Sequence, residues 1–326
     1  MTSLRDTLEG QQIKIYFAAI GAAVAVALIV PGTTALEVGI NPSLTLMLFV
    51  TFLQVPLPDL GRAFTRVRFL GALLVANFVV VPLLVAGLIQ FLPANPMLRL
   101  GVLMVLLTPC IDYVVTFSHL GRADAKVLLA STPALLLAQM ALLPVYLTAF
   151  LGEDAARFVQ VGPFLHAFVW LIAVPLVLAA AVQLLSGRSR TGQRVADGLG
   201  LLPVPATALV LFVVIAAVLP QLGPALNEAL RVVPIYVAFA ITAPLLGWGV
   251  SRLFRLDAPT GRALAFSAAT RNSLVVLPLA FAVPGSVPLL PAVIVTQTLV
   301  ELVSELLYVR LVPKLGSSTE ALASAA

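Results

Sequence analysis

Apolar runs of about 20 residues recur along the whole chain, and only short polar segments separate them. This is the length at which an α-helix crosses the hydrocarbon core of a bilayer. Only 10% of the residues are charged, whereas soluble domains carry roughly 25%. The sequence therefore predicts an all-α membrane protein with the lipid bilayer as its surroundings.

Ten of these runs are predicted to be transmembrane helices. The predicted spans are residues 13–31, 40–57, 69–92, 97–120, 125–151, 161–186, 200–220, 230–252, 263–283 and 287–312. No cleavage-site pattern precedes the first span, so we expect a retained helix there. Residues 313–326 are predicted to form a short cytoplasmic tail.

The distribution of Lys and Arg indicates how the spans are oriented. Fifteen of these residues lie at the chain ends and in alternate loops, whereas only Arg99, Arg157 and Arg231 lie in the opposite loops or at their edges. Cytoplasmic loops are enriched in positive charge. We therefore expect both termini in the cytoplasm and the protein in the cell (inner or plasma) membrane. The net charge of +5 reflects this orientation and does not indicate nucleic-acid binding.

The two halves of the chain resemble each other when the second is aligned on the first without gaps. In this alignment, called the repeat register below, "LPDLGRA" (57–63) falls on "LPQLGPA" (219–225), Thr108 on Thr270, and Tyr146 on Tyr308. A repeat with five spans, an odd number, must be inverted in the membrane, which is a transporter architecture. The predicted repeats are residues 1–151 and 152–312. The alternative is a coincidental similarity between helices rich in Leu, Val and Ala.

The repeat places two predicted helix breaks in corresponding positions. "TPC" (108–110) falls on "TRN" (270–272), in the fourth and ninth spans. Pro109 removes a backbone donor, and "TRNS" combines weak helix formers with side chains that compete for the backbone. We expect the broken helices 4 and 9 to cross, and the positive ends of their second halves to form a binding site for an anion or an electron-rich solute. The candidate substrate-binding residues are Thr108, Cys110, Asp112, Asn272 and Ser273.

Two opposite charges are predicted to lie near this crossing, Asp112 and Arg271. An unpaired charge at the bilayer centre costs at least roughly 2.5–3.5 kcal/mol. We expect the two residues to pair, with a structural clamp as the alternative to a role in ion coupling. Asp112, Thr116 and His119 also share one helical face and indicate a lined cavity, although His119 is more simply a histidine at the membrane interface.

Two carboxylates in the last span, Glu301 and Glu305, are candidates for ion or proton coupling. They lie one helical turn apart, so in a low dielectric both should not be ionised at once. Glu305 has the alternative of reaching the cytoplasmic boundary. Gln139 is the repeat partner of Glu301 and is expected to face the same cavity. Cys110 is either a reactive thiol at a helix N-terminus or a small buried hydrophobe.

These features resemble the bile acid:sodium symporter superfamily over nearly the whole chain. "TPCIDYVVTFSHLGRAD" (108–124) is similar to the fourth span of the arsenite-permease branch, roughly A-P-C-T-A-M-V-F-V-W-S and a Gly-Asp loop. "TQTLVELVSELLYVRL" (296–311) resembles the glutamate-bearing tenth span of that branch and aligns Glu301 with its acid. The resemblance implies that Cys110 and Glu301 are functional, and that arsenite or a related metalloid is extruded against protons.

The departures from the family patterns concern the ninth span. Arg271 replaces an amide and Leu274 an acid of the arsenite-permease pattern N-N-F-E. The bile-acid branch reads roughly E-x-x-x-Q-N-S there, where this chain has Ser267 and Arg271. The comparison implies that the sodium-binding carboxylate is missing and that a fixed cation occupies its neighbourhood.

Taken together, these patterns predict a secondary active transporter of a small anion or metalloid, most simply proton-coupled arsenite efflux. The alternative is a sodium-coupled symporter of an organic anion. The sequence contains no H-E-x-x-H, G-x-S-x-G or Walker A motif, so we expect no enzyme activity, cofactor or metal centre. An inverted repeat also favours alternating access over a channel.

Overall fold

The computed structural model describes residues 4–54, 66–111, 113–152, 169–281, 283, 285–286 and 288–316. The described part is helical, as predicted. Its longer helices are α1 (Leu4–Ile29), α2 (Ile40–Leu53), α8 (Ala125–Leu151), α11 (Val174–Ser186), α13 (Pro203–Val218), α14 (Leu222–Leu253) and α17 (Leu289–Leu311). The shorter ones are α4 (Val67–Val75), α5 (Val81–Leu88), α6 (Pro96–Leu106), α7 (Tyr113–Leu120), α12 (Arg190–Leu199), α15 (Ala258–Ala269) and α16 (Ser273–Phe281).

Seven helical segments among the described residues are long and apolar enough to cross a membrane. Each of them overlaps one predicted span. Two of the other predicted spans, 97–120 and 263–283, are each divided into two short helices. The last, 161–186, is helical from Val169 onward, and its start lies outside the described residues.

Some predicted boundaries were wrong. α1 begins at Leu4, well before the predicted start at residue 13. Residues 187–197 were expected to form a loop, but most of them belong to α12, where the Ser189 hydroxyl accepts a hydrogen bond from the Gly192 amide at 3.0 Å. A polar helix capped by serine carries no hydropathy signal, so the apolar windows could not find it.

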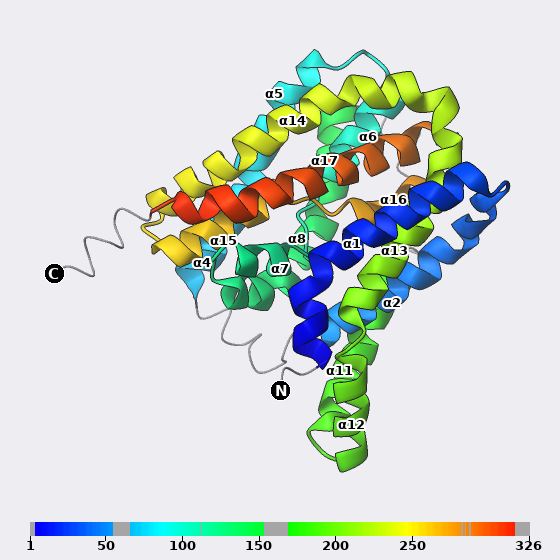
Figure 1. Ribbon diagram of the computed structural model, residues 1–326. Helices are drawn as coiled ribbons and strands as arrows, with labels where there is room; N and C mark the ends of the chain where they lie inside the picture. Colours follow the sequence, from blue (N-terminus) through cyan, green and yellow to red (C-terminus); the bar gives the residue numbers. More distant parts are fainter. Residues whose placement is uncertain are drawn as a thin grey trace.

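The helices pack in two groups (Figure 1). α1, α2, α11 and α13 contact one another on one side of the molecule. On the other side, α14 packs along α15 and α17, and α6 packs against α17. α7 and α8 lie beside this second group, where they contact α15 and α6 respectively. The first halves of the two divided helices, α6 and α15, therefore belong to the second group, and α7 lies beside it.

Two tyrosines compensate for two prolines within the helices. Pro82 and Pro244 carry no N–H, so the carbonyls of Phe78 and Ala240, four residues earlier, lack their regular donor. The Tyr146 hydroxyl donates to the Phe78 carbonyl, and the Tyr308 hydroxyl donates to the Ala240 carbonyl. The tyrosines, the prolines and the carbonyls all correspond to each other in the repeat register found in the sequence.

The Tyr308→Phe substitution is expected to destabilise the protein by about 1–3 kcal/mol, because it leaves the Ala240 carbonyl unsatisfied. Adding Pro244→Ala restores the missing N–H, so the double variant should be more stable than Tyr308→Phe alone. Thermal unfolding of the three proteins in detergent tests this. If Pro244→Ala lowers stability further in the Tyr308→Phe background, the tyrosine does not compensate for the proline.

Candidate functional site

The two breaks predicted from the sequence are present, and they meet. α6 ends at Leu106 and α7 begins at Tyr113, while α15 ends at Ala269 and α16 begins at Ser273. Between these halves, Pro109 and Arg271 form an isolated antiparallel β-bridge. The two divided helices therefore contact each other through extended backbone.

The hydrogen bonds at this crossing are reciprocal. The Cys110 amide donates to the Thr270 carbonyl at 3.0 Å, and the Asn272 amide donates to the Thr108 carbonyl at 2.8 Å. The repeat register pairs Thr108 with Thr270 and Cys110 with Asn272. When each residue is replaced by its repeat partner, the first of these bonds becomes the second. The two chain segments thus occupy equivalent positions about the bridge.

The Arg271 side chain is completely buried, and it is the largest of the fully buried side chains among the described residues. Its Nη2 donates to the Asn77 side-chain oxygen at 2.8 Å and to the carbonyls of Ser267 and Ala268 at 2.5 and 2.8 Å. Its Nη1 donates to the Leu106 carbonyl at 3.4 Å.

Aromatic packing completes the surroundings of this guanidinium. Its carbon lies 5.5 Å from the centre of the Phe239 ring, within the range of a cation–π contact. None of the ion pairs within the described residues involves Arg271. Asp112, its predicted partner, lies outside the described residues, so that pairing stays a prediction.

Glu301 lies at the crossing and accepts three hydrogen bonds. The donors are the Tyr113 hydroxyl, the Arg271 amide at 2.7 Å and the Gln297 side-chain amide at 2.6 Å. Charge-assisted bonds of this kind hold a carboxylate firmly in one orientation. The expected interior position of Glu301 agrees with this geometry, and its role in coupling stays a prediction.

Glu305 is also buried, at 0% exposure. One of its oxygens accepts a hydrogen bond from the Thr270 hydroxyl at 2.5 Å. The other has no hydrogen-bond partner among the described residues. The two carboxylates therefore differ: Glu301 has three donors, and Glu305 has one.

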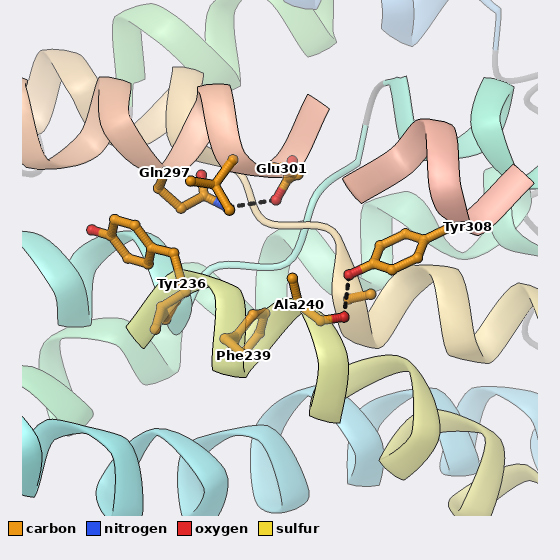
Figure 2. Close-up of a pocket in the computed structure, with 9 residues that line it drawn as sticks. Tyr236, Phe239, Ala240, Gln297, Glu301 and Tyr308 are labelled. Atoms are coloured by element: carbon orange, nitrogen blue, oxygen red, sulfur yellow. Dashed lines mark hydrogen bonds between the residues drawn. The ribbon is translucent and has the colours of Figure 1, made fainter. Parts of the chain in front are cut away.

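A small void lies beside Glu301 on the side facing α14. Its volume is about 10 Å³, and its lining includes Tyr236, Phe239, Gln297 and Glu301. Figure 2 shows the Gln297–Glu301 and Tyr308–Ala240 hydrogen bonds among the residues that line this void. The void is too small to hold a solute on this side of the carboxylate.

The other candidate substrate-binding residues are brought together, but they are closed off. Thr108, Cys110, Asn272 and Ser273 are each no more than 1% exposed. The Asn272 side-chain oxygen caps α16 by accepting from the Val275 amide at 3.3 Å. The Ser273 hydroxyl accepts from Thr298 at 2.8 Å. In this conformation these four residues support the crossing rather than line an open site.

The open space lies next to them, between α1, α2 and α13 on one side and α7 and α8 on the other. This cavity has a volume of about 510 Å³. Its polar lining includes Glu9, Gln12, Tyr113, Thr116, His119 and Lys126. The predicted polar face of 112–119 thus borders a cavity at Thr116 and His119.

Tyr113 joins the cavity to the crossing. Its side chain lines the cavity, while its hydroxyl donates to Glu301 and lies 3.3 Å from the Arg271 carbonyl. The Tyr113 side chain therefore links the open space to the buried carboxylate. Among the described residues, no group of three or more His, Cys, Asp or Glu side chains could hold a metal ion.

Sequence reasoning missed two residues of this site. Tyr113 was not singled out, although it directly follows the break. Asn77 was not among the candidate residues, but it contacts Arg271 from the π-helical turn Ala76–Val80. The repeat offered a signal, because Asn77 is the repeat partner of Phe239, which contacts the same guanidinium.

Divided helices that meet inside a bundle, beside a polar cavity, are features of a membrane transporter. The comparisons with known proteins agree. Residues 41–224, more than half of the chain, match the sequence model of the Sodium Bile acid symporter family. The chain therefore belongs to that family and is a membrane transporter of this kind. No curated protein sequence matches the chain.

Proposed function

We propose that the chain is a secondary active transporter of a small anion or metalloid, working by alternating access in the cell membrane. The leading substrate is arsenite or a similar metalloid oxyanion, exported in exchange for protons. The observation that carries this proposal is the link from the polar cavity through Tyr113 to Glu301. It supports the proposal because Glu301, the carboxylate that we propose to bind the proton, is linked to a space large enough for a solute.

The proposed architecture is ten spans in two inverted repeats, residues 1–151 and 152–312, followed by the tail 313–326. The reciprocal backbone bonds at the crossing and the two Tyr–Pro pairs support it, since all of them obey the repeat register. With both termini in the cytoplasm, the Lys126 end of the cavity opens toward the cytoplasm. The cavity is then the inward-facing entrance for an exported solute.

Cys110 supports a metalloid substrate. Cys110 lies in the segment just before the second half of the divided helix. Its thiolate form is a soft ligand suited to trivalent metalloids. The thiol is buried in this conformation, so a substrate reaches it only after the side chains between the cavity and the crossing have moved. Tyr113 lines the cavity and bonds to Glu301 at the crossing, and it is one of these side chains in our proposal.

The second candidate is a sodium-coupled symporter of an organic anion. The description of the matching family favours it, as does a cavity of about 510 Å³, which is larger than a metalloid oxyanion requires. In this case Glu301 would hold the crossing together without exchanging protons. The two candidates differ in substrate and in driving ion.

Thermal unfolding of the purified protein with arsenite, antimonite or organic anions distinguishes the substrates, because a ligand that binds only the folded state raises the unfolding temperature. We expect arsenite and antimonite to stabilise the parent and not Cys110→Ala. Ser118→Ala is the matched control, since Ser118 is buried in α7 and its hydroxyl donates to the Val115 carbonyl of the same helix. Stabilisation by an organic anion alone, unchanged in Cys110→Ala, would support the second candidate.

A further inference from the structure

The breaks in the two helices take the regular amide donors away from several backbone carbonyls, and three of these carbonyls face Arg271. In an α-helix, each carbonyl accepts from the amide four residues later. The amide of Arg271 instead donates to Glu301, the amide of Asn272 to Thr108, and the amide of Cys110 to Thr270. The carbonyls that lose these three donors are therefore those of Ser267, Ala268 and Leu106.

These same three carbonyls hold the Arg271 guanidinium. They belong to the C-terminal ends of α15 and α6, which carry the negative ends of the helix dipoles. Both first half-helices thus direct their negative ends at one positively charged group.

A fourth oxygen comes from Asn77, whose orientation is set by its other bonds. Its side-chain nitrogen donates to the Leu73 carbonyl at 3.1 Å and to the Ser267 hydroxyl at 3.0 Å. The amide oxygen is then left to face the guanidinium at 2.8 Å. Nη2 has three oxygen neighbours but only two hydrogens, so its positive charge, and not hydrogen bonding alone, satisfies them.

We propose that Arg271 is a resident cation that fills a cation-binding cage of four oxygens at the crossing, so that this transporter takes no sodium ion there. Carbonyls of unwound segments and half-helix C-terminal ends are the groups that coordinate sodium in transporters with divided helices. Here the side chain of the chain itself occupies that position. The cage does not depend on the proposed substrate; only its consequence for coupling rests on the proposed function.

The test is to empty the cage and supply a small cation. Arg271→Ala is expected to unfold at a clearly lower temperature than the parent, because the four oxygens lose their cation. Guanidinium chloride at millimolar concentration, well below the molar range in which it denatures proteins, should raise the unfolding temperature of Arg271→Ala by several degrees. Sodium should also raise it, relative to choline, which is too large for the cage. The parent should respond to neither.

Arg252→Ala is the matched control, since Arg252 is an exposed arginine whose guanidinium lies over Trp248. An equal rise in Arg252→Ala, or no rise in folded Arg271→Ala, contradicts the resident cation. If Arg271→Ala folds only when guanidinium or sodium is present, the proposal is supported. If Arg271→Ala folds with neither guanidinium nor sodium, Arg271→Lys is the deciding variant. A folded Arg271→Lys protein whose unfolding temperature does not respond to sodium supports the need for a positive charge in the cage. An unfolded Arg271→Lys protein contradicts it. Because no step measures transport, the result is independent of the substrate.

Discussion

Glu301→Gln is expected to abolish transport against a gradient, while exchange of substrate across the membrane continues. Glutamine cannot release a proton, so a carrier that returns only after losing that proton can no longer complete a net cycle. The steps that move bound substrate between the two sides remain. Concentrative uptake into vesicles should fall to background, and counterflow of labelled substrate should persist.

The geometry around Glu301 allows this substitution to fold. A glutamine oxygen can accept from the Arg271 amide and from Gln297, in place of the carboxylate oxygen that does so now. Its nitrogen would then face the Tyr113 hydroxyl, which can accept a hydrogen bond and donate to the Arg271 carbonyl 3.3 Å away. We expect a loss of about 1.5–3 kcal/mol, since hydrogen bonds to a charged group are replaced by neutral ones.

Glu305→Gln is the matched control, one turn along the same buried face. Glu305 accepts a hydrogen bond from the Thr270 hydroxyl. Among the described residues, no residue that lines the cavity of about 510 Å³ forms a hydrogen bond with the Glu305 carboxylate. We expect Glu305→Gln to retain concentrative transport. If Glu305→Gln loses it and Glu301→Gln keeps it, the proton-binding carboxylate has been assigned to the wrong residue.

The sequence was sufficient to predict what depends on local chemistry. Pro109 and the "TRNS" segment break helices for reasons contained in a few residues, and the structure has breaks at both places. The interior position of Glu301 followed from an acid in the middle of an apolar run. The family followed from the residues around Cys110 and Glu301, and the match over residues 41–224 confirms the superfamily.

The remainder depends on contacts between distant segments. Asn77 meets Arg271 across 194 positions of the chain, and no local pattern distinguishes it from an asparagine that bonds between helices. Cys110 is buried where its segment bonds to Thr270 of the other divided helix. The expectation that the substrate-binding residues line an open site assumed that the breaks border the cavity, whereas Tyr113 lies between them in this conformation.

We propose that this transporter is driven by protons and not by sodium, because Glu301 is linked to the cavity and Arg271 occupies the proposed cation cage. Flux into proteoliposomes, measured with separately imposed pH and sodium gradients and with the substrate identified by thermal stabilisation, tests it most directly. We expect a pH gradient to drive accumulation and replacement of all sodium by choline to leave the rate unchanged. Accumulation driven by a sodium gradient at equal pH on both sides would contradict the account.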